Sequence, residues 1–285
     1  MLEREQPRLP KTFGAHIATA FDNYGQLCVG IDPHIALLED WGLDDSADSL
    51  LKFGRAVIEA SAGRVGIVKP QVAFFERHGS AGFAALELLT REARDAGLLV
   101  IADAKRGDIG TTMHAYLDAW LGKASPFFAD ALTVSPYLGA DVYLSEMAPF
   151  FERGKGLISL VATSNPEGAS VQTSLAREQF EKICRVNQIA AGPGDRLGSV
   201  GAVIGATLNL SKFGLDLDAQ QGVKTPILAP GFGAQGAELS EIGRLFGSAK
   251  STVIASVSRS IAENGQGGLE KAIDGHKLQL EKGLA

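Results

Sequence analysis

The chain has 285 residues, 45% hydrophobic and 21% charged, a composition typical of a globular protein that folds without disulfides or bound metals. A formal net charge of −6 and a sequence pI of about 5.5, without any dense run of lysine and arginine, argue against nucleic-acid binding. An anionic ligand would therefore need a locally positive site in an acidic protein.

The cysteines and the N-terminus point to a cytoplasmic protein. Cys28 and Cys184 form no CxxC motif, so neither a zinc site nor a disulfide framework is expected, and both thiols are predicted to be reduced. The charged, proline-containing stretch Met1–Lys11 lacks the apolar centre of a signal peptide. No window approaches the roughly 18 apolar residues of a membrane span, so no membrane association is expected.

Eight short apolar runs, rich in β-branched residues, are the clearest pattern in the chain. Nearly continuous apolar runs of this length are typical of parallel strands that are buried on both faces. We predict strands at Leu27–Asp32, Val65–Pro70, Leu98–Lys105, Ala131–Ser135, Leu157–Ala162, Val200–Ala206, Pro226–Pro230 and Thr252–Arg259.

The stretches between these runs have helical periodicity. Leu50–Ala60 has one apolar face and Ser49 as a candidate N-cap, and Ala81–Ala96 is followed by Gly97 as a stop signal. A further helical stretch is expected near Leu175–Ala191, within the long connection 165–199. Alternating strands and helices predict an α/β fold, and eight pairs favour a closed (β/α)8 TIM barrel over an open doubly wound sheet.

One domain is predicted over residues 1–285, with residues 1–21 as an N-terminal extension that covers the barrel bottom or contributes to a dimer. The polar stretch Leu210–Gln221 has weak periodicity and yields no clear prediction.

Charged residues end several predicted strands, where a barrel carries its active site. Asp32, Lys69, Asp103 with Lys105, and Arg259 all stand at or near such ends. A charge at the tip of an apolar strand costs free energy unless it is paired or used, so these residues are the first candidates for chemistry.

The third strand is the most informative. Asp103 and Lys105 are two residues apart and should point to the same side of a strand, with Asp108 just beyond and Lys69 on the neighbouring strand. Carboxylates on both sides of a buried ammonium keep it protonated, which suits a proton donor that also stabilises a developing carbanion. The alternative is a structural ion-pair network at the barrel mouth.

A second candidate site follows the seventh strand. The glycine-rich segment Pro230–Gly236 can bring backbone N–H groups close to an anion, and Arg259 can make a two-pronged contact with phosphate. Barrels commonly bind phosphate at these two loops. The five histidines show no metal-ligand spacing and are interpreted as surface or packing residues, as Cys28 is interpreted as a core residue.

Together these residues resemble the orotidine 5′-monophosphate decarboxylase family. The family hallmark D-x-K-x-x-D-I reads Asp103–Ile109 here, and four further landmarks occur in the right order along the chain: Val29–Asp32, Val68–Pro70, Pro230–Gly236 and Ser258–Ile261. The segment Thr163–Pro166 and the chain length resemble the larger bacterial subgroup.

The resemblance implies decarboxylation of orotidine 5′-monophosphate to uridine 5′-monophosphate, the last step of de novo pyrimidine biosynthesis, without a metal or another cofactor. By the same resemblance Lys105 protonates C6 of the pyrimidine, while Asp103 faces the substrate carboxylate. Asp32 and Lys69 hold the ribose hydroxyls and complete the charge array.

The remaining site residues are also implied only by the resemblance. Ser164 contacts the pyrimidine ring, Pro230 shapes the pocket beside it, and Gln235 and Arg259 bind the phosphate next to Gly233. The resemblance further implies a homodimer with shared active sites, in which three residues reach the site of the other subunit: Asp108, Ile109 and Thr112.

Two alternatives remain at this point. Related barrels that act on sugar phosphates, such as keto-gulonate phosphate decarboxylase and hexulose phosphate synthase, resemble Mg²⁺ enzymes with a glutamate ligand where Lys69 stands here. A cation at that position would repel Mg²⁺ rather than bind it. The other alternative is a non-catalytic barrel that senses pyrimidine nucleotides, which would need the phosphate loop but not the charge array.

Overall fold

The structure, a computed structural model, describes residues 12–234 and 236–285. Eight parallel strands pair in chain order and close into a barrel, as predicted. Each predicted apolar run overlaps one of them: β1 Leu27–Ile31, β2 Ile67–Pro70, β3 Leu99–Arg106, β4 Ala131–Val134, β5 Gly156–Ala162, β6 Val200–Ile204, β7 Ile227–Ala229 and β8 Val253–Val257.

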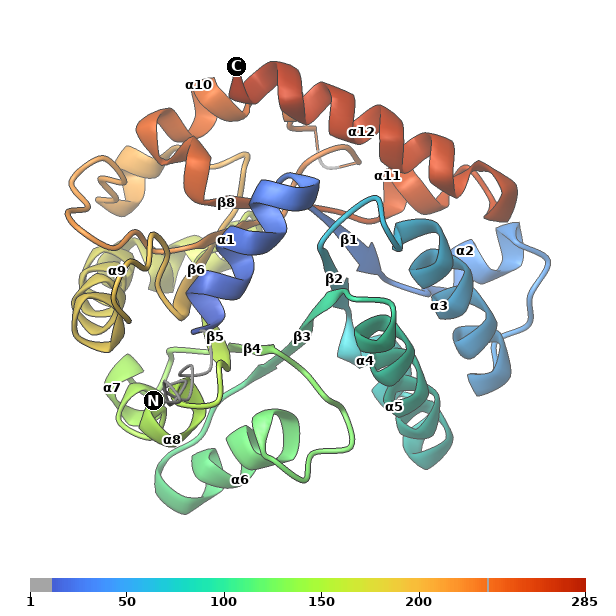
Figure 1. Cartoon of the computed structure of the whole chain (residues 1–285), viewed down its shortest axis with the longest axis horizontal. Helices are drawn as coiled ribbons and strands as arrows, with labels where there is room; N and C mark the ends of the chain where they lie inside the picture. The colour runs from blue at the N-terminus through green and yellow to red at the C-terminus, as the bar shows by residue number, and fades with distance from the viewer. Residues whose placement is uncertain (1–11, 235) are drawn as a thin grey trace, which may run out of the picture.

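Helices surround the barrel (Figure 1). They are α1 Phe13–Tyr24, α2 Ile35–Asp40, α3 Ala47–Ser61, α4 Val72–Glu76, α5 Gly79–Asp95, α6 Gly110–Leu121, α7 Ala140–Leu144, α8 Ala148–Phe151, α9 Ala169–Ala190, α10 Ile242–Phe246, α11 Arg259–Ala262 and α12 Leu269–Leu284. The connection from β6 to β7 instead contains a 3-10 turn at Leu210–Phe213, which ends at Gly214 in a left-handed conformation. This irregular turn explains the weak periodicity of that stretch.

Helix ends differ from the predictions where capping groups compete. The predicted cap Ser49 is wrong, because the Ser46 side chain accepts the hydrogen bond from the Ser49 backbone N–H and α3 begins at Ala47. Ser49 itself lies in the first turn, and its hydroxyl donates to Asp44. Helix α9 begins at Ala169, before the predicted Leu175. The stop at Gly97 is confirmed, with φ +80°.

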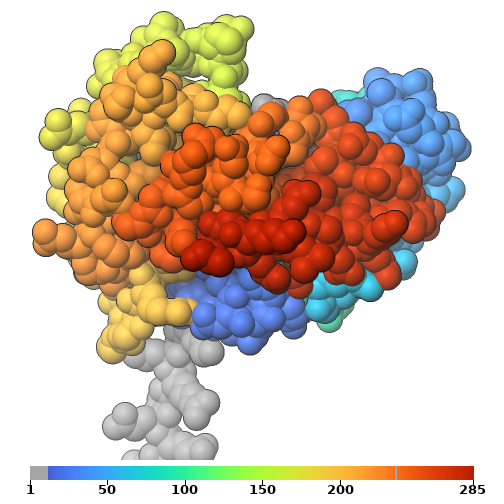
Figure 2. Space-filling model, turned by 90° about the horizontal axis from the view of Figure 1, so that it is seen from above, coloured from blue at the N-terminus to red at the C-terminus, as the bar shows by residue number. Residues whose placement is uncertain are grey.

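Helix α1 seals one end of the barrel. Its buried residues Phe13 and Ile17 pack with apolar side chains that the strands send inward, among them Ile101, Ile158 and Ile254. Glycine is required opposite, since a Cβ on Gly156 would lie 2.1 Å from the Phe13 ring. In Figure 1, α1 crosses in front of the strands; in Figure 2, which shows the α12 side, α1 lies at the lower edge.

The described part of the expected extension 1–21 therefore covers the barrel bottom, while residues 1–11 lie outside the described residues. Among the residues described, no helix is long and apolar enough to cross a membrane.

Candidate active site

Four charged side chains form an alternating row at the carboxyl ends of β1, β2 and β3. Lys69 Nζ lies 4.0 Å from Asp32 Oδ1 and 3.0 Å from Asp103 Oδ2, and Lys105 Nζ lies 2.7 Å from Asp103 Oδ1. Parallel strands place their carboxyl ends at one rim, which brings these residues together from three strands. The structure thus joins Asp32, Lys69, Asp103 and Lys105 in one charge array.

Asp103 and Lys69 are both buried, and each keeps the other charged. Burial alone would raise the pKa of Asp103, but the ammonium groups of Lys69 and Lys105 outweigh it and hold that pKa well below its usual range. Burial alone would lower the pKa of Lys69, but the carboxylates of Asp103 and Asp32 raise it above its usual value. Asp103 and Lys69 are therefore both ionised at neutral pH.

Lys105 reaches the array by an unexpected route. Its φ is +49°, and the pairing of β3 with β4 shifts register between Ala102 and Arg106, so simple strand alternation does not bring it beside Asp103. The Thr133 hydroxyl accepts from the Lys105 backbone N–H at 2.9 Å and fixes the bend. The expectation of a buried Lys105 is wrong, because 43% of its side chain is exposed at the barrel mouth.

The array lines a cavity of about 380 Å³ at the barrel mouth. Asp32, Lys69, Asp103 and Lys105 lie along one wall, while Leu160, Val203 and Leu228 supply apolar surface. Ser164, Pro230 and Arg259, three further predicted site residues, also line it. A cavity with one ionic wall and apolar surface elsewhere suits a flat ring that carries a charged substituent.

The end of the cavity near β7 and β8 has the features expected for an anion site. Arg259 is exposed, and among the described residues no acidic side chain forms an ion pair with it. Gly233 has φ +71°, and a Cβ there would lie 2.4 Å from the Ser260 hydroxyl. Gly233 shapes the turn rather than lining the cavity, because its N–H donates to the Ala237 carbonyl. Gln235 lies outside the described residues.

Asp108, Ile109 and Thr112 do not line the cavity of their own barrel. The expected placement of Asp108 beside Lys105 is wrong within one chain: its carboxylate instead accepts from the Ile109 N–H at 2.8 Å. Ile109 is 59% exposed, and Tyr137 and Leu138, after the adjacent strand β4, are 75% and 52% exposed. These three apolar side chains are exposed on the segments that follow the neighbouring strands β3 and β4.

Sequence reasoning missed three residues that lie at the site. Gln71 donates to Asp103 Oδ2 and accepts from Lys105 Nζ, and Thr133 donates to Asp103 Oδ1 at 2.9 Å. His34, interpreted from the sequence as a surface or packing residue, also lines the cavity. Gln71 could have been found, because it stands two residues after Lys69 and extended chain places both on one side.

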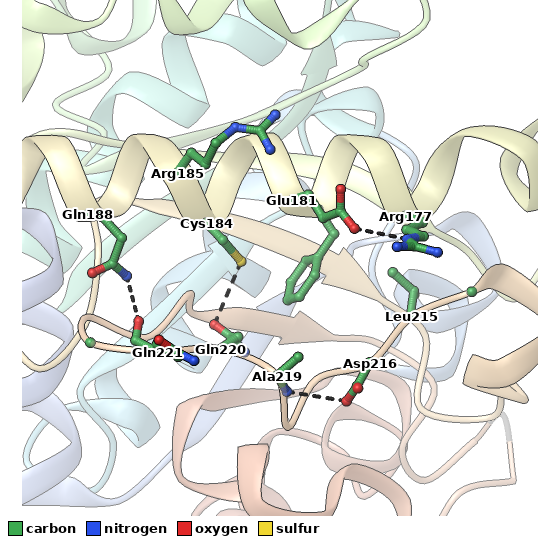
Figure 3. A pocket seen from close by; sticks show the side chains of 13 residues that line it. Arg177, Glu181, Cys184, Arg185, Gln188, Leu215, Asp216, Ala219, Gln220 and Gln221 are labelled. Carbon is green, nitrogen blue, oxygen red and sulfur yellow. Dashed lines mark hydrogen bonds and ion pairs between the residues drawn. The ribbon is translucent and has the colours of Figure 1, made fainter.

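A larger hollow, about 800 Å³, lies outside the barrel between α9 and residues 214–222 (Figure 3). Its polar groups are mostly paired with each other: Arg177 binds Glu181, and Gln188 donates to the Gln221 carbonyl. The Arg185 side chain points away from the hollow. Cys184 contacts Gln220 and Thr225, and burial raises the pKa of its thiol. The hollow does not include any member of the charge array.

Comparison with known proteins agrees with this geometry. The model of the orotidine 5′-phosphate decarboxylase / HUMPS family matches residues 25–271. The chain belongs to this family. The resemblance inferred from the sequence is confirmed.

Curated relatives named orotidine 5′-phosphate decarboxylase include proteins from Streptomyces coelicolor, 48% identical over 89% of this chain and 90% of the relative, and Salinispora arenicola, 47% identical over 90% and 91%. A crystal structure from Streptomyces avermitilis assigned to the same enzyme has a TM-score of 0.88 and 43% identity, covering 99% of both chains. The Leishmania donovani OMP decarboxylase structure has a TM-score of 0.72 and 26% identity, covering 96% of this chain and 99% of that one.

Proposed function

We propose that the chain is an orotidine 5′-phosphate decarboxylase, a carboxy-lyase that converts orotidine 5′-monophosphate to uridine 5′-monophosphate in the last step of UMP biosynthesis. The observation that carries this proposal is the array of Asp32, Lys69, Asp103 and Lys105 along one wall of the barrel cavity. The names of the relatives support the same activity.

The array suits a reaction that leaves charge on carbon. As the bond from C6 to the carboxylate breaks, CO2 departs and the electron pair stays on C6. Lys105 Nζ then donates a proton to C6, and the resulting neutral amine is reprotonated by solvent. Because Asp103 and Lys69 are held ionised by one another, the ammonium groups are fixed before the reaction and need no reorganisation as the carbanion forms.

Asp103 has two roles in this scheme. It orients Lys105 through the contact of 2.7 Å, and it faces the substrate carboxylate, whose charge it disfavours relative to neutral CO2. Contacts far from C6, made by Arg259 and Gln235 at the phosphate beside Gly233, supply binding energy that offsets this repulsion. Pro230 and Ser164 hold the base itself.

We further propose a homodimer with shared active sites. Asp108, Ile109 and Thr112 lie outside the cavity of their own barrel, at its rim. Ile109, Tyr137 and Leu138 are large exposed apolar side chains of the kind that a second subunit covers. A cytoplasmic location, as expected of a biosynthetic enzyme, is part of the same proposal.

Lys69 distinguishes this proposal from the Mg²⁺-dependent relatives. Its ammonium stands at the end of β2, where those enzymes would carry a metal ligand, and it is paired with Asp103. Among the described residues, no three histidine, cysteine, aspartate or glutamate side chains are grouped to hold a metal ion.

The decisive test is a steady-state assay with orotidine 5′-monophosphate, following the loss of substrate ultraviolet absorbance in the presence of excess EDTA. We expect rapid turnover that the chelator does not change. Turnover only after addition of Mg²⁺ would favour the sugar-phosphate relatives. Nucleotide binding without any turnover would favour a nucleotide-sensing barrel.

A further inference from the structure

Two polar atoms in the cavity wall after β1 have no hydrogen-bond partner among the described residues. They are Asp32 Oδ1 and His34 Nε2, and both are buried. The nearest cation to Asp32 Oδ1 is Lys69 Nζ, at 4.0 Å, beyond hydrogen-bond distance. An unmet buried polar atom destabilises the folded chain, so two of them on one short loop call for an explanation.

The hydrogen-bonding role of His34 is fixed by the helix that it begins. His34 is the N-cap of α2, and its Nδ1 accepts from the Leu37 backbone N–H at 3.3 Å. Because Nδ1 accepts, the ring proton is assigned to Nε2, which is therefore a donor. The ring is also held from the side by Phe74, at 6.3 Å between centroids.

The two unmet atoms thus have complementary roles. Asp32 Oδ1 needs a donor, His34 Nε2 needs an acceptor, and both residues line the cavity that holds the charge array. A hydroxyl is the group that can donate to one and accept from the other at once. In orotidine 5′-monophosphate the only hydroxyls are the two on the ribose.

We propose that His34 recognises the ribose of the substrate. Its Nε2–H donates a hydrogen bond to the same ribose hydroxyl that donates to the Asp32 carboxylate. This inference rests on the proposed function for its substrate and adds a specificity-determining residue to it. Since neither atom is exposed to solvent, the hydroxyl reaches them only as lining side chains move aside. Binding energy at the phosphate can drive that movement.

The test separates the Nε2 donor from the helix cap. A serine at an N-cap keeps the capping hydrogen bond, so His34→Ser should leave thermal stability unchanged and remove only the donor. We expect kcat/KM for orotidine 5′-monophosphate to fall about tenfold, as for the loss of one hydrogen bond. One of the two deoxy substrates, 2′-deoxy or 3′-deoxy, lacks the hydroxyl that His34 binds. On that substrate His34→Ser and the unmodified protein should have the same kcat/KM.

The matched control is Ser46→Ala, which removes the cap of α3 away from the cavity. It should lower stability without changing the ratio of activities on the hydroxyl and deoxy substrates. If His34→Ser lowers activity equally on all three substrates, or on none, His34 does not read the sugar.

A binding measurement keeps this inference separate from the proposed function. Calorimetry with uridine 5′-monophosphate and its 2′- and 3′-deoxy analogues requires no turnover. If the unmodified protein discriminates between them and His34→Ser does not, His34 reads the sugar even where decarboxylation is absent. If His34→Ser discriminates between these nucleotides as well as the unmodified protein does, the proposed role of His34 is overturned. The decarboxylase proposal is still tested by its own assay.

Discussion

At the scale of single residues, the site is built around one carboxylate. Asp103 is bound by two ammonium groups and two neutral donors, Lys69, Lys105, Gln71 and Thr133, which together satisfy both of its oxygens. A carboxylate with four donors is held rigidly and stays ionised even though it is buried. Its position therefore sets the position of the proposed proton donor.

Removing the proton donor should separate chemistry from binding. Lys105→Ala is expected to lower kcat by at least about 10³-fold, because the general acid and the cation beside C6 are lost together. Binding of uridine 5′-monophosphate, measured by calorimetry, should remain largely intact. Lys182→Ala, which removes a lysine from the outer helix α9, is the control and should keep full activity. A near-normal kcat for Lys105→Ala would rule out its role as the acid.

The effect of removing the Arg259 side chain should depend on whether the substrate carries the phosphate. Arg259→Ala is expected to raise KM for orotidine 5′-monophosphate by about 10–100-fold, as for loss of a charge-assisted hydrogen bond. The kcat/KM for orotidine, which lacks the phosphate, should hardly change. Equal losses on both substrates in a steady-state comparison would show that Arg259 acts elsewhere.

The depressed pKa of Asp103 predicts a pH dependence of stability. Its folded pKa lies below its unfolded value of about 4, so its ionic contribution is present above about pH 4 and is lost as pH falls towards the folded pKa. Urea unfolding at several pH values should therefore show the unmodified protein losing free energy of unfolding below about pH 4 more steeply than Asp103→Asn. Parallel curves would show that Asp103 is not paired in solution.

At the scale of elements, helix α1 is a structural part of the barrel rather than an appendage. Ile17 is fully buried among inward-facing strand residues, whereas Thr19 on the same helix is exposed. Because the barrel interior beneath the site is filled partly by this helix, its packing supports the strands whose opposite ends carry the array.

Truncating the buried face of α1 should affect stability and not chemistry. Ile17→Ala is expected to lower the free energy of unfolding by about 2–5 kcal/mol, the usual cost of a core cavity, with kcat unchanged at low temperature. Thr19→Ala serves as the surface control and should change stability little. Urea denaturation and the steady-state assay measure the two effects; a stable Ile17→Ala variant would mean that α1 packs more loosely than described.

Elements were predictable to different degrees, for physical reasons. The strands are buried on both faces, so their apolar runs mark them directly in the sequence. Helix boundaries depend on which of several polar side chains caps the helix, and Ser46 rather than Ser49 does so in α3. The positive φ of Lys105 has no sequence signal, because it follows from the Thr133 contact on a neighbouring strand.

The site was predictable only in part. Charges at strand ends, Asp32, Lys69, Asp103 and Lys105, stand out against apolar runs and were found. His34 was missed, because its spacing matches no ligand motif and its helix-capping role appears only in the structure. Nothing local in the sequence reports that Asp108 lies apart from Lys105 in its own chain.

At the scale of the whole molecule, a shared site predicts complementation between inactive subunits. Lys105→Ala and Asp108→Ala proteins should each be inactive, but a mixture should recover up to about one quarter of full activity if a heterodimer carries one intact site. That fraction follows from random pairing, in which about half of the dimers are mixed and each mixed dimer has one of its two sites intact. Activity of the mixture after verified subunit exchange is the measurement. If the subunits exchange and no activity returns, Lys105 and Asp108 of one subunit serve the same active site.

The sealed barrel bottom has a consequence for how the chain matures on the ribosome. Helix α1 precedes all eight strands in the chain, yet the residues it packs against include Ile158, Leu228 and Ile254. Thr12 donates to Asp195, which is 183 residues further along. The helix can be seated only when the eighth strand has emerged and the barrel has closed. Until then its apolar face has no barrel interior to pack against, so barrel closure is also the step that buries this face and lowers the tendency of the nascent chain to aggregate.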